Sequence, residues 1–251
     1  MSLFTAAGAM ILLPATAPAA SLVDVTIVDR TSGETLQVHR HHGERYIAGE
    51  PGHEYEIRLR NPEGSRLLAV TSVDGVNVLT GTTASYSQGG YVLDPYSVVS
   101  IDGWRKSLDE VAAFYFTSLP DSYAARTGRP DNVGVIGIAI LREKQVIQSV
   151  VAEAVDAADA QGSAQSRAPS ALKRPDSDRL GTGHGPRHDS FAQRVEFERA
   201  SDQPDAVIRI YYDSRRNLVA RGVIRPDDPG RGFGRRSPDP FPDAVAFVPD
   251  P

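Results

Sequence analysis

The sequence is constrained most by short runs in which apolar and polar residues alternate, separated by glycine, proline, asparagine and aspartate. A period of two places alternate side chains on opposite faces of a β-strand, whereas a helix needs a period near 3.6. The runs cover residues 23–29, 36–41, 45–48, 54–60, 67–73, 76–79, 97–101, 111–117 and 133–141. This pattern predicts a mainly β fold, an immunoglobulin-like or jelly-roll-like sandwich.

Two details refine this prediction. Asp74-Gly75 stands between two alternating runs, which is a strong signal for a tight hairpin. The run 133–141 is apolar on both faces and contains two glycines, so it predicts a central strand that neighbouring elements approach closely.

Composition limits the chemistry. The chain of 251 residues is 40% hydrophobic and can fill a core, and it has no cysteine. Disulfides, thiolate metal sites and cysteine nucleophiles are therefore excluded. The net charge of −5 provides no overall basic field, so we expect no nucleic-acid partner.

Residues 1–20 form a small, apolar stretch ending near Ala17-Pro18-Ala19, which fits the pattern cleaved by a signal peptidase. No Lys or Arg precedes the apolar run. We predict a signal peptide cleaved near Ala19 or Ala20, no transmembrane segment after it, and a periplasmic or secreted protein.

Composition also divides the rest of the chain. We predict a β-sandwich domain at 21–144, a flexible and partly helical linker at 145–178, a small docked segment at 179–224, and a disordered Pro-rich tail at 225–251. The small segment is expected to contain a glycine loop at 180–185, strands at 194–197 and 206–212, and a short helix after Ser214 that ends at Gly222.

The glycine-rich stretch supplies the candidate catalytic residues. His184, His188 and Ser190 lie near Asp189 and contain the residue types of acid-base or nucleophilic chemistry. The stretch lacks the Lys-Ser or Lys-Thr ending of a phosphate-binding loop, and the chain has no GxSxG elbow. A glycine loop that simply enters the second segment is the alternative.

Aromatic residues cluster between positions 86 and 123. Tyr86, Tyr91, Trp104 and Tyr123 are candidates for stacking on sugar rings or on a partner protein. The alternative is that such residues supply core volume, as is expected for Phe114 and Phe116.

His39 and His41 share one face of a predicted strand and are candidate zinc or copper ligands. No third ligand is placed beside them by the pattern. The alternative is an exposed edge strand whose His and Arg residues discourage aggregation, and we expect no cofactor.

Several strings together resemble a family of uncharacterised bacterial proteins. The resemblance covers most of the chain after the leader and rests on YEIRLRNPEG, AVTSVDGVNVLTG, GYVLDPYSVVSIDGWRKSLDEVAAFYFT, GTGHG, FERAS and IYYDSRRNLVARGV. It implies no assigned reaction, cofactor or catalytic residue. It does imply that the glycine loop and the YYDS helix belong to one recurring unit.

The sequence therefore predicts an exported, non-enzymatic β-sandwich with a structural or macromolecular-interaction role in the cell envelope. The expected partner is another envelope protein or a second copy of the chain. The alternatives are a hydrolase that uses His184 or His188 and a glycan-binding protein that uses the loop aromatics.

Overall fold

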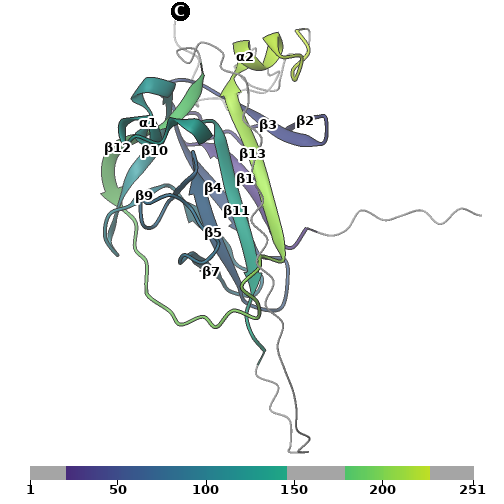
Figure 1. Cartoon of the computed structure of the whole chain (residues 1–251), viewed down its shortest axis with the longest axis vertical. Helices are drawn as coiled ribbons and strands as arrows, with labels where there is room; N and C mark the ends of the chain where they lie inside the picture. Colours follow the sequence, from purple (N-terminus) through teal and green to yellow (C-terminus); the bar gives the residue numbers. More distant parts are fainter. Residues whose placement is uncertain (1–20, 146–178, 227–251) are drawn as a thin grey trace, which may run out of the picture.

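Two β-sheets packed face to face make up the body of the protein (Figure 1). The computed structural model describes residues 21–145 and 179–226. Large apolar side chains from both sheets fill the space between them, among them Tyr55, Phe114 and Phe116 from one sheet and Ile136 and Ile138 from the other. The prediction of a mainly β sandwich is confirmed.

The first sheet, sheet A, is antiparallel. Its strand order is β1 (Asp24–Asp29), β4 (Glu54–Arg60), β10 (Glu110–Ser118), β12 (Leu180–Asp189), with β8 (Val98–Ile101) paired to β4 and β9 (Gly103–Arg105) paired to β10. β12 therefore forms one edge of the sheet. The side chains that alternate inward along β4 are fully buried, which explains why its bounds agree with the predicted run.

The second sheet, sheet B, is mixed. Its strand order is β2 (His39–His41), β3 (Glu44–Gly49), β13 (Ala206–Ser214), β11 (Val135–Arg142), β5 (Leu67–Val73), β6 (Val76–Asn77), with β7 (Tyr91–Leu93) paired to β5. β3 and β13 are parallel, and the other pairs are antiparallel. β11 lies between two strands, as its apolar faces predict.

Short helices lie at one end of the sandwich, where β10 and β13 end and β11 begins (Figure 1). They are η1 (Leu119–Asp121), α1 (Tyr123–Arg126), η2 (Pro130–Asn132) and α2 (Arg215–Ala220). At the start of α2 the Ser214 hydroxyl accepts a hydrogen bond from the Asn217 amide at 3.3 Å. Gly222, which follows the helix, has a φ of 72°. The predicted short helix after Ser214 is confirmed, and its residue Leu218 is buried.

The predicted glycine loop is wrong, because residues 180–185 begin strand β12. Gly181, Gly183 and Gly185 alternate along it and share one face of the strand. A Cβ atom on Gly183 would lie 2.2 Å from Cζ of Tyr115, which stands on the neighbouring strand β10 directly opposite. Gly183 and Gly185 leave room for the Tyr115 ring, and Gly181 leaves room for Ser122 and Val133, so the glycines serve close packing and not a turn.

The strand predicted at 194–197 is also wrong. These residues lie in the segment between β12 and β13 and form no strand. Val195 is exposed, and only Phe197 packs inward, against a small cluster on the outer face of sheet B that includes Leu68 and Leu141. The strand at 206–212 is confirmed as β13.

Residues 179–224 contribute one strand to each sheet, β12 to sheet A and β13 to sheet B. Two carboxylates of sheet B accept hydrogen bonds from backbone amides on the edge of β12. Asp74 Oδ2 accepts from the Thr182 amide at 2.8 Å, and Asp213 Oδ1 accepts from the Leu180 amide at 3.3 Å. These bonds join the two sheets where the sandwich would otherwise leave backbone donors unpaired.

The predicted signal peptide, the linker from residue 146 and the tail from residue 227 lie outside the described residues. Within the part of the chain that the structure describes, no helix has the length and apolar character needed to cross a membrane.

Candidate functional site

The structure brings two of the three predicted catalytic residues to one carboxylate. His188 Nε2 lies 2.9 Å from Oδ2 of Asp102, and the Ser190 hydroxyl donates to Oδ1 of the same residue at 3.3 Å. Asp102 stands between β8 and β9, whereas His188 is on β12, paired with Val111 of β10. The carboxylate thus orients both side chains.

Arginines complete this cluster. Arg30 Nη1 lies 3.2 Å from His188 Nε2, and Arg105 donates to the carbonyl and the hydroxyl of Ser190. In a nucleophilic triad the histidine lies between the hydroxyl and the carboxylate. Here the Asp102 carboxylate lies between the histidine and the hydroxyl. This arrangement holds the end of β12 and the residue that follows it against Asp102.

His184 lies apart from this cluster, on a stack of aromatic rings. Its ring centroid is 5.7 Å from that of Tyr123, which in turn is 4.7 Å from that of Trp104. Burial lowers the pKa of His184, and the positive charge of Lys106 lowers it further. The neutral imidazole therefore acts here as an apolar ring that covers Tyr123.

The predicted aromatic binding residues do not form one exposed platform. Trp104 is only 3% exposed, and its indole donates to the Gly183 carbonyl at 3.0 Å. Tyr91 lies against Arg105, whose guanidinium carbon is 5.9 Å from the centre of its ring. Tyr86 alone is well exposed, at 44%.

His39 and His41 share one face of β2, opposite Tyr46 and Glu44 of β3. The ring of His41 contacts that of His42, with centroids 4.1 Å apart. Across residues 21–145 and 179–226, no three His, Asp or Glu side chains come together in a way that would hold a metal ion.

A chain of buried hydroxyls ends on Asp74, in the turn after β5. The Tyr212 hydroxyl donates to Asp74, and the Thr182 hydroxyl lies 2.7 Å from the hydroxyls of both Tyr212 and Tyr55. Burial raises the pKa of Asp74 to about 6, although hydrogen bonds from Tyr212, Thr182 and Gly134 lower it. Each donor has an acceptor, so this network is a structural link between the sheets.

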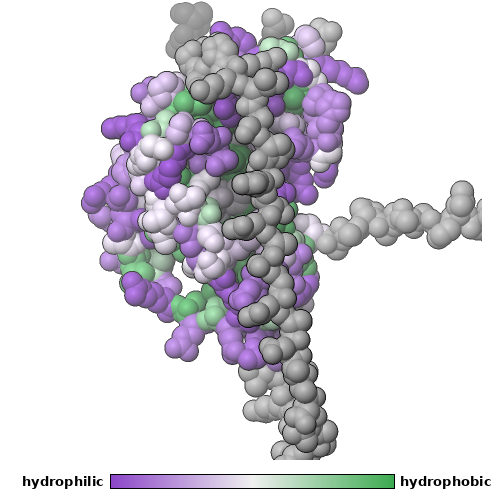
Figure 2. Space-filling model, viewed as in Figure 1, coloured by the Kyte–Doolittle hydropathy of each residue, from purple (hydrophilic) through white to green (hydrophobic). Residues whose placement is uncertain are grey.

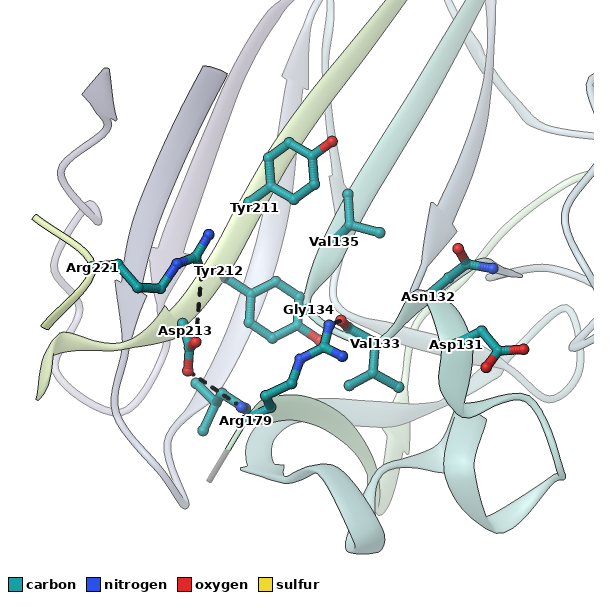
Figure 3. Close-up of a pocket in the computed structure, with 11 residues that line it drawn as sticks. Asp131, Asn132, Val133, Gly134, Val135, Arg179, Tyr211, Tyr212, Asp213 and Arg221 are labelled. Carbon is teal, nitrogen blue, oxygen red and sulfur yellow. Dashed lines mark hydrogen bonds and ion pairs between the residues drawn. The ribbon is translucent and has the colours of Figure 1, made fainter. Parts of the chain in front are cut away.

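Clefts occur instead on both sides of Tyr211, on β13. The first, of about 260 Å³, opens where β11 begins and β13 ends, and Figure 3 shows Arg179 and Arg221 directed toward it from different elements. The second, of about 310 Å³, lies between the tip of the β2–β3 hairpin and β13, beside Arg45 and Arg209. Tyr211 lines both clefts.

The arginines of the two clefts differ in how they are held. Arg179 donates to the Val133 carbonyl at 2.7 Å, and Arg221 lies 3.8 Å from Asp213 and 5.3 Å from the centre of the Tyr46 ring. Arg45 and Arg209 have neither an ion pair nor a side-chain hydrogen bond within the described residues. We call these four arginines with Tyr211 the β13 surface.

Sequence reasoning missed the β13 surface, although part of the signal was present. In Ile208-Arg209-Ile210-Tyr211 the isoleucines alternate inward, so Arg209 and Tyr211 had to face outward. Arg45 and Arg179 are distant in sequence, and only the strand pairing brings them near β13. Comparisons with known protein families, with curated proteins and with solved structures give no match for the chain.

Proposed function

We propose that the protein is a non-enzymatic component of the cell envelope that binds another macromolecule through the β13 surface. The observation that carries this proposal is the pair of adjoining clefts that share Tyr211 and contain four arginines. Arginine and tyrosine are the residue types enriched at binding hot spots. The leader-like first 20 residues support a periplasmic or secreted location, which fractionation of the host cell would test.

Site-directed photo-crosslinking tests the proposal in the cell that makes the protein. Benzoylphenylalanine replaces Tyr211 in one variant and Tyr86 in a control, because both positions already hold an aromatic ring. We expect one defined crosslinked species from position 211 and none from position 86. Absence of a product at 211, or the same products at both positions, would contradict the proposal.

A hydrolase is the second candidate, favoured by the meeting of Asp102, His188 and Ser190. Its chemistry would require Ser190 to turn from Asp102 to the imidazole of His188, since both side chains contact the Asp102 carboxylate and not each other in this structure. A fluorophosphonate probe distinguishes the candidates. Labelling of Ser190 that is lost in His188→Ala would favour the hydrolase, and an unlabelled chain would favour the binding protein.

A further inference from the structure

Sheet B contains a notch beside the first half of β13. β13 runs from Ala206 to Ser214, yet its parallel partner β3 pairs only with residues 211–214. β3 begins directly after the His42-Gly43 turn that follows β2, and β2 pairs with β3 on the side away from β13. Figure 1 shows β2 and β3 beside the upper part of β13 only.

The backbone of β13 directs hydrogen-bonding groups into this notch. The Tyr212 amide donates to the Gly134 carbonyl of the β11 side, which fixes the phase of the antiparallel ladder. Backbone groups in a strand point alternately to the two sides, so Ile210 and Ile208 also face β11. The amides and carbonyls of Val207 and Arg209 therefore point away from β11, into the notch.

The second cleft lies at this place. Gly43, Glu44 and Arg45 form its end, and Val207, Arg209 and Tyr211 form its side. Its volume is about 310 Å³, and its lining places it between the start of β3 and the part of β13 that β3 leaves unpaired. The notch thus has both open backbone groups and room for a chain to reach them.

The charge of the notch is positive. Arg45 and Arg209 have no acidic partner among the described residues, and the one acidic residue of the cleft, Glu44, accepts a hydrogen bond from the Tyr46 hydroxyl at 2.6 Å. This contrasts with the net charge of −5 for the whole chain. Figure 2 shows hydrophilic residues gathered at the upper right, where Figure 1 places β2 and β3.

We propose that an acidic, extended segment of another protein adds to sheet B as a strand alongside residues 206–210 of β13. Its backbone pairs with Val207 and Arg209, and its carboxylates meet Arg45 and Arg209. This inference rests on the proposed function and names the partner chemistry of the β13 surface. Strand addition provides affinity through main-chain hydrogen bonds, and alternate side chains provide specificity.

A second copy of this chain does not fit the notch as well. Two β13 strands paired about a twofold axis would bring Arg209 of one copy close to Arg209 of the other. Like charges on facing strands destabilise the pairing. An acidic segment removes this repulsion and gives both arginines a partner.

Selection from a random twelve-residue peptide library on the whole mature chain tests the proposal. We expect enriched peptides with Asp or Glu at alternate positions. Affinity for the best peptide should fall at least about tenfold in Arg45→Glu/Arg209→Glu, because two attractions become repulsions. Arg194→Glu, an exposed arginine on the 190–205 segment, should leave affinity unchanged and serves as the control. Thermal unfolding confirms that each variant is folded.

Hydrogen exchange of the same complexes locates the peptide. Binding should slow exchange of the amides of residues 207 and 209, which point away from β11 and lie beyond the residues of β13 that pair with β3. Enrichment of neutral or basic peptides, no enrichment, or protection elsewhere would each overturn strand addition. If strand addition fails but position 211 still gives a defined crosslink in the cell, binding through the β13 surface stands. If position 211 gives no crosslink either, both proposals fail.

Discussion

The buried carboxyl of Asp74 should make the protein less stable as the pH rises. Its pKa is about 6 in the folded protein, against 3.8 for an unperturbed carboxyl. Between these values the folded chain holds a proton that the unfolded chain has released. The free energy of unfolding is therefore greatest, as far as this group is concerned, below pH 4 and decreases as the pH rises through 6.

The size of the effect follows from the same two values. A shift of one pKa unit corresponds to about 1.4 kcal/mol, so Asp74 should reduce the free energy of unfolding by about 3 kcal/mol in total. About 2 kcal/mol of this should be lost between pH 4 and pH 6. The cost persists at neutral pH because the ionised carboxylate remains buried, held by Tyr212, Thr182 and Gly134.

Urea unfolding of the wild type and Asp74→Asn from pH 3.5 to 7.5 isolates this contribution from all other groups. The amide cannot accept a hydrogen bond at both of its ends, so one of the Thr182 and Gly134 amides loses its acceptor. This should cost about 1–3 kcal/mol. The free energy of unfolding of the wild type, minus that of the variant, should therefore decrease as the pH rises. A difference that is constant with pH, or that grows with pH, would refute the reasoning.

Three further predictions follow from packing and capping. Gly183→Ala should destabilise the protein by about 1–3 kcal/mol in thermal unfolding, because the added methyl group meets the Tyr115 ring. The control Gly89→Ala places its methyl group in open space and should change stability by less than about 0.5 kcal/mol. Ser214→Ala should cost about 1 kcal/mol in urea unfolding through loss of the α2 cap, and Ser214→Thr should restore most of it; equal values for both variants would contradict the capping role. Trp104 should show blue-shifted emission that iodide quenches poorly, and emission like that of free tryptophan would show that the ring is exposed.

The strands were predictable where each one satisfies its own pattern. β4 and β5 agree with their predicted bounds because their apolar residues meet the core directly. β7 and β9 have three residues each, too few for a period to appear. β12 was missed because glycine has no side chain by which a burial pattern can be recognised, and its alternation becomes meaningful only once Tyr115 is known to lie over it.

The candidate site was predictable only in parts. His188 and Ser190 were singled out together, yet Asp102, the residue that joins them, has the sequence context of an ordinary turn acid. Trp104 was a candidate for binding, yet it lies on β9, pairs with Ala112 of β10, and has a buried ring. The β13 surface depends on a parallel pairing between β3 and β13, which are far apart in the chain, and no local pattern encodes such a pairing.

The position of β13 between β3 and β11 also has a consequence for synthesis. A ribosome that has released only residues 21–145 has produced a β2–β3 hairpin with no neighbour in sheet B, and a β10 strand without its outer partner. Sheet A lacks β12 until residue 189 has been made, and sheet B lacks β13 until residue 214 has been made, so we expect both sheets to finish folding late in synthesis. The order of strands along the chain therefore makes folding of this domain depend on contacts between its first and last described segments.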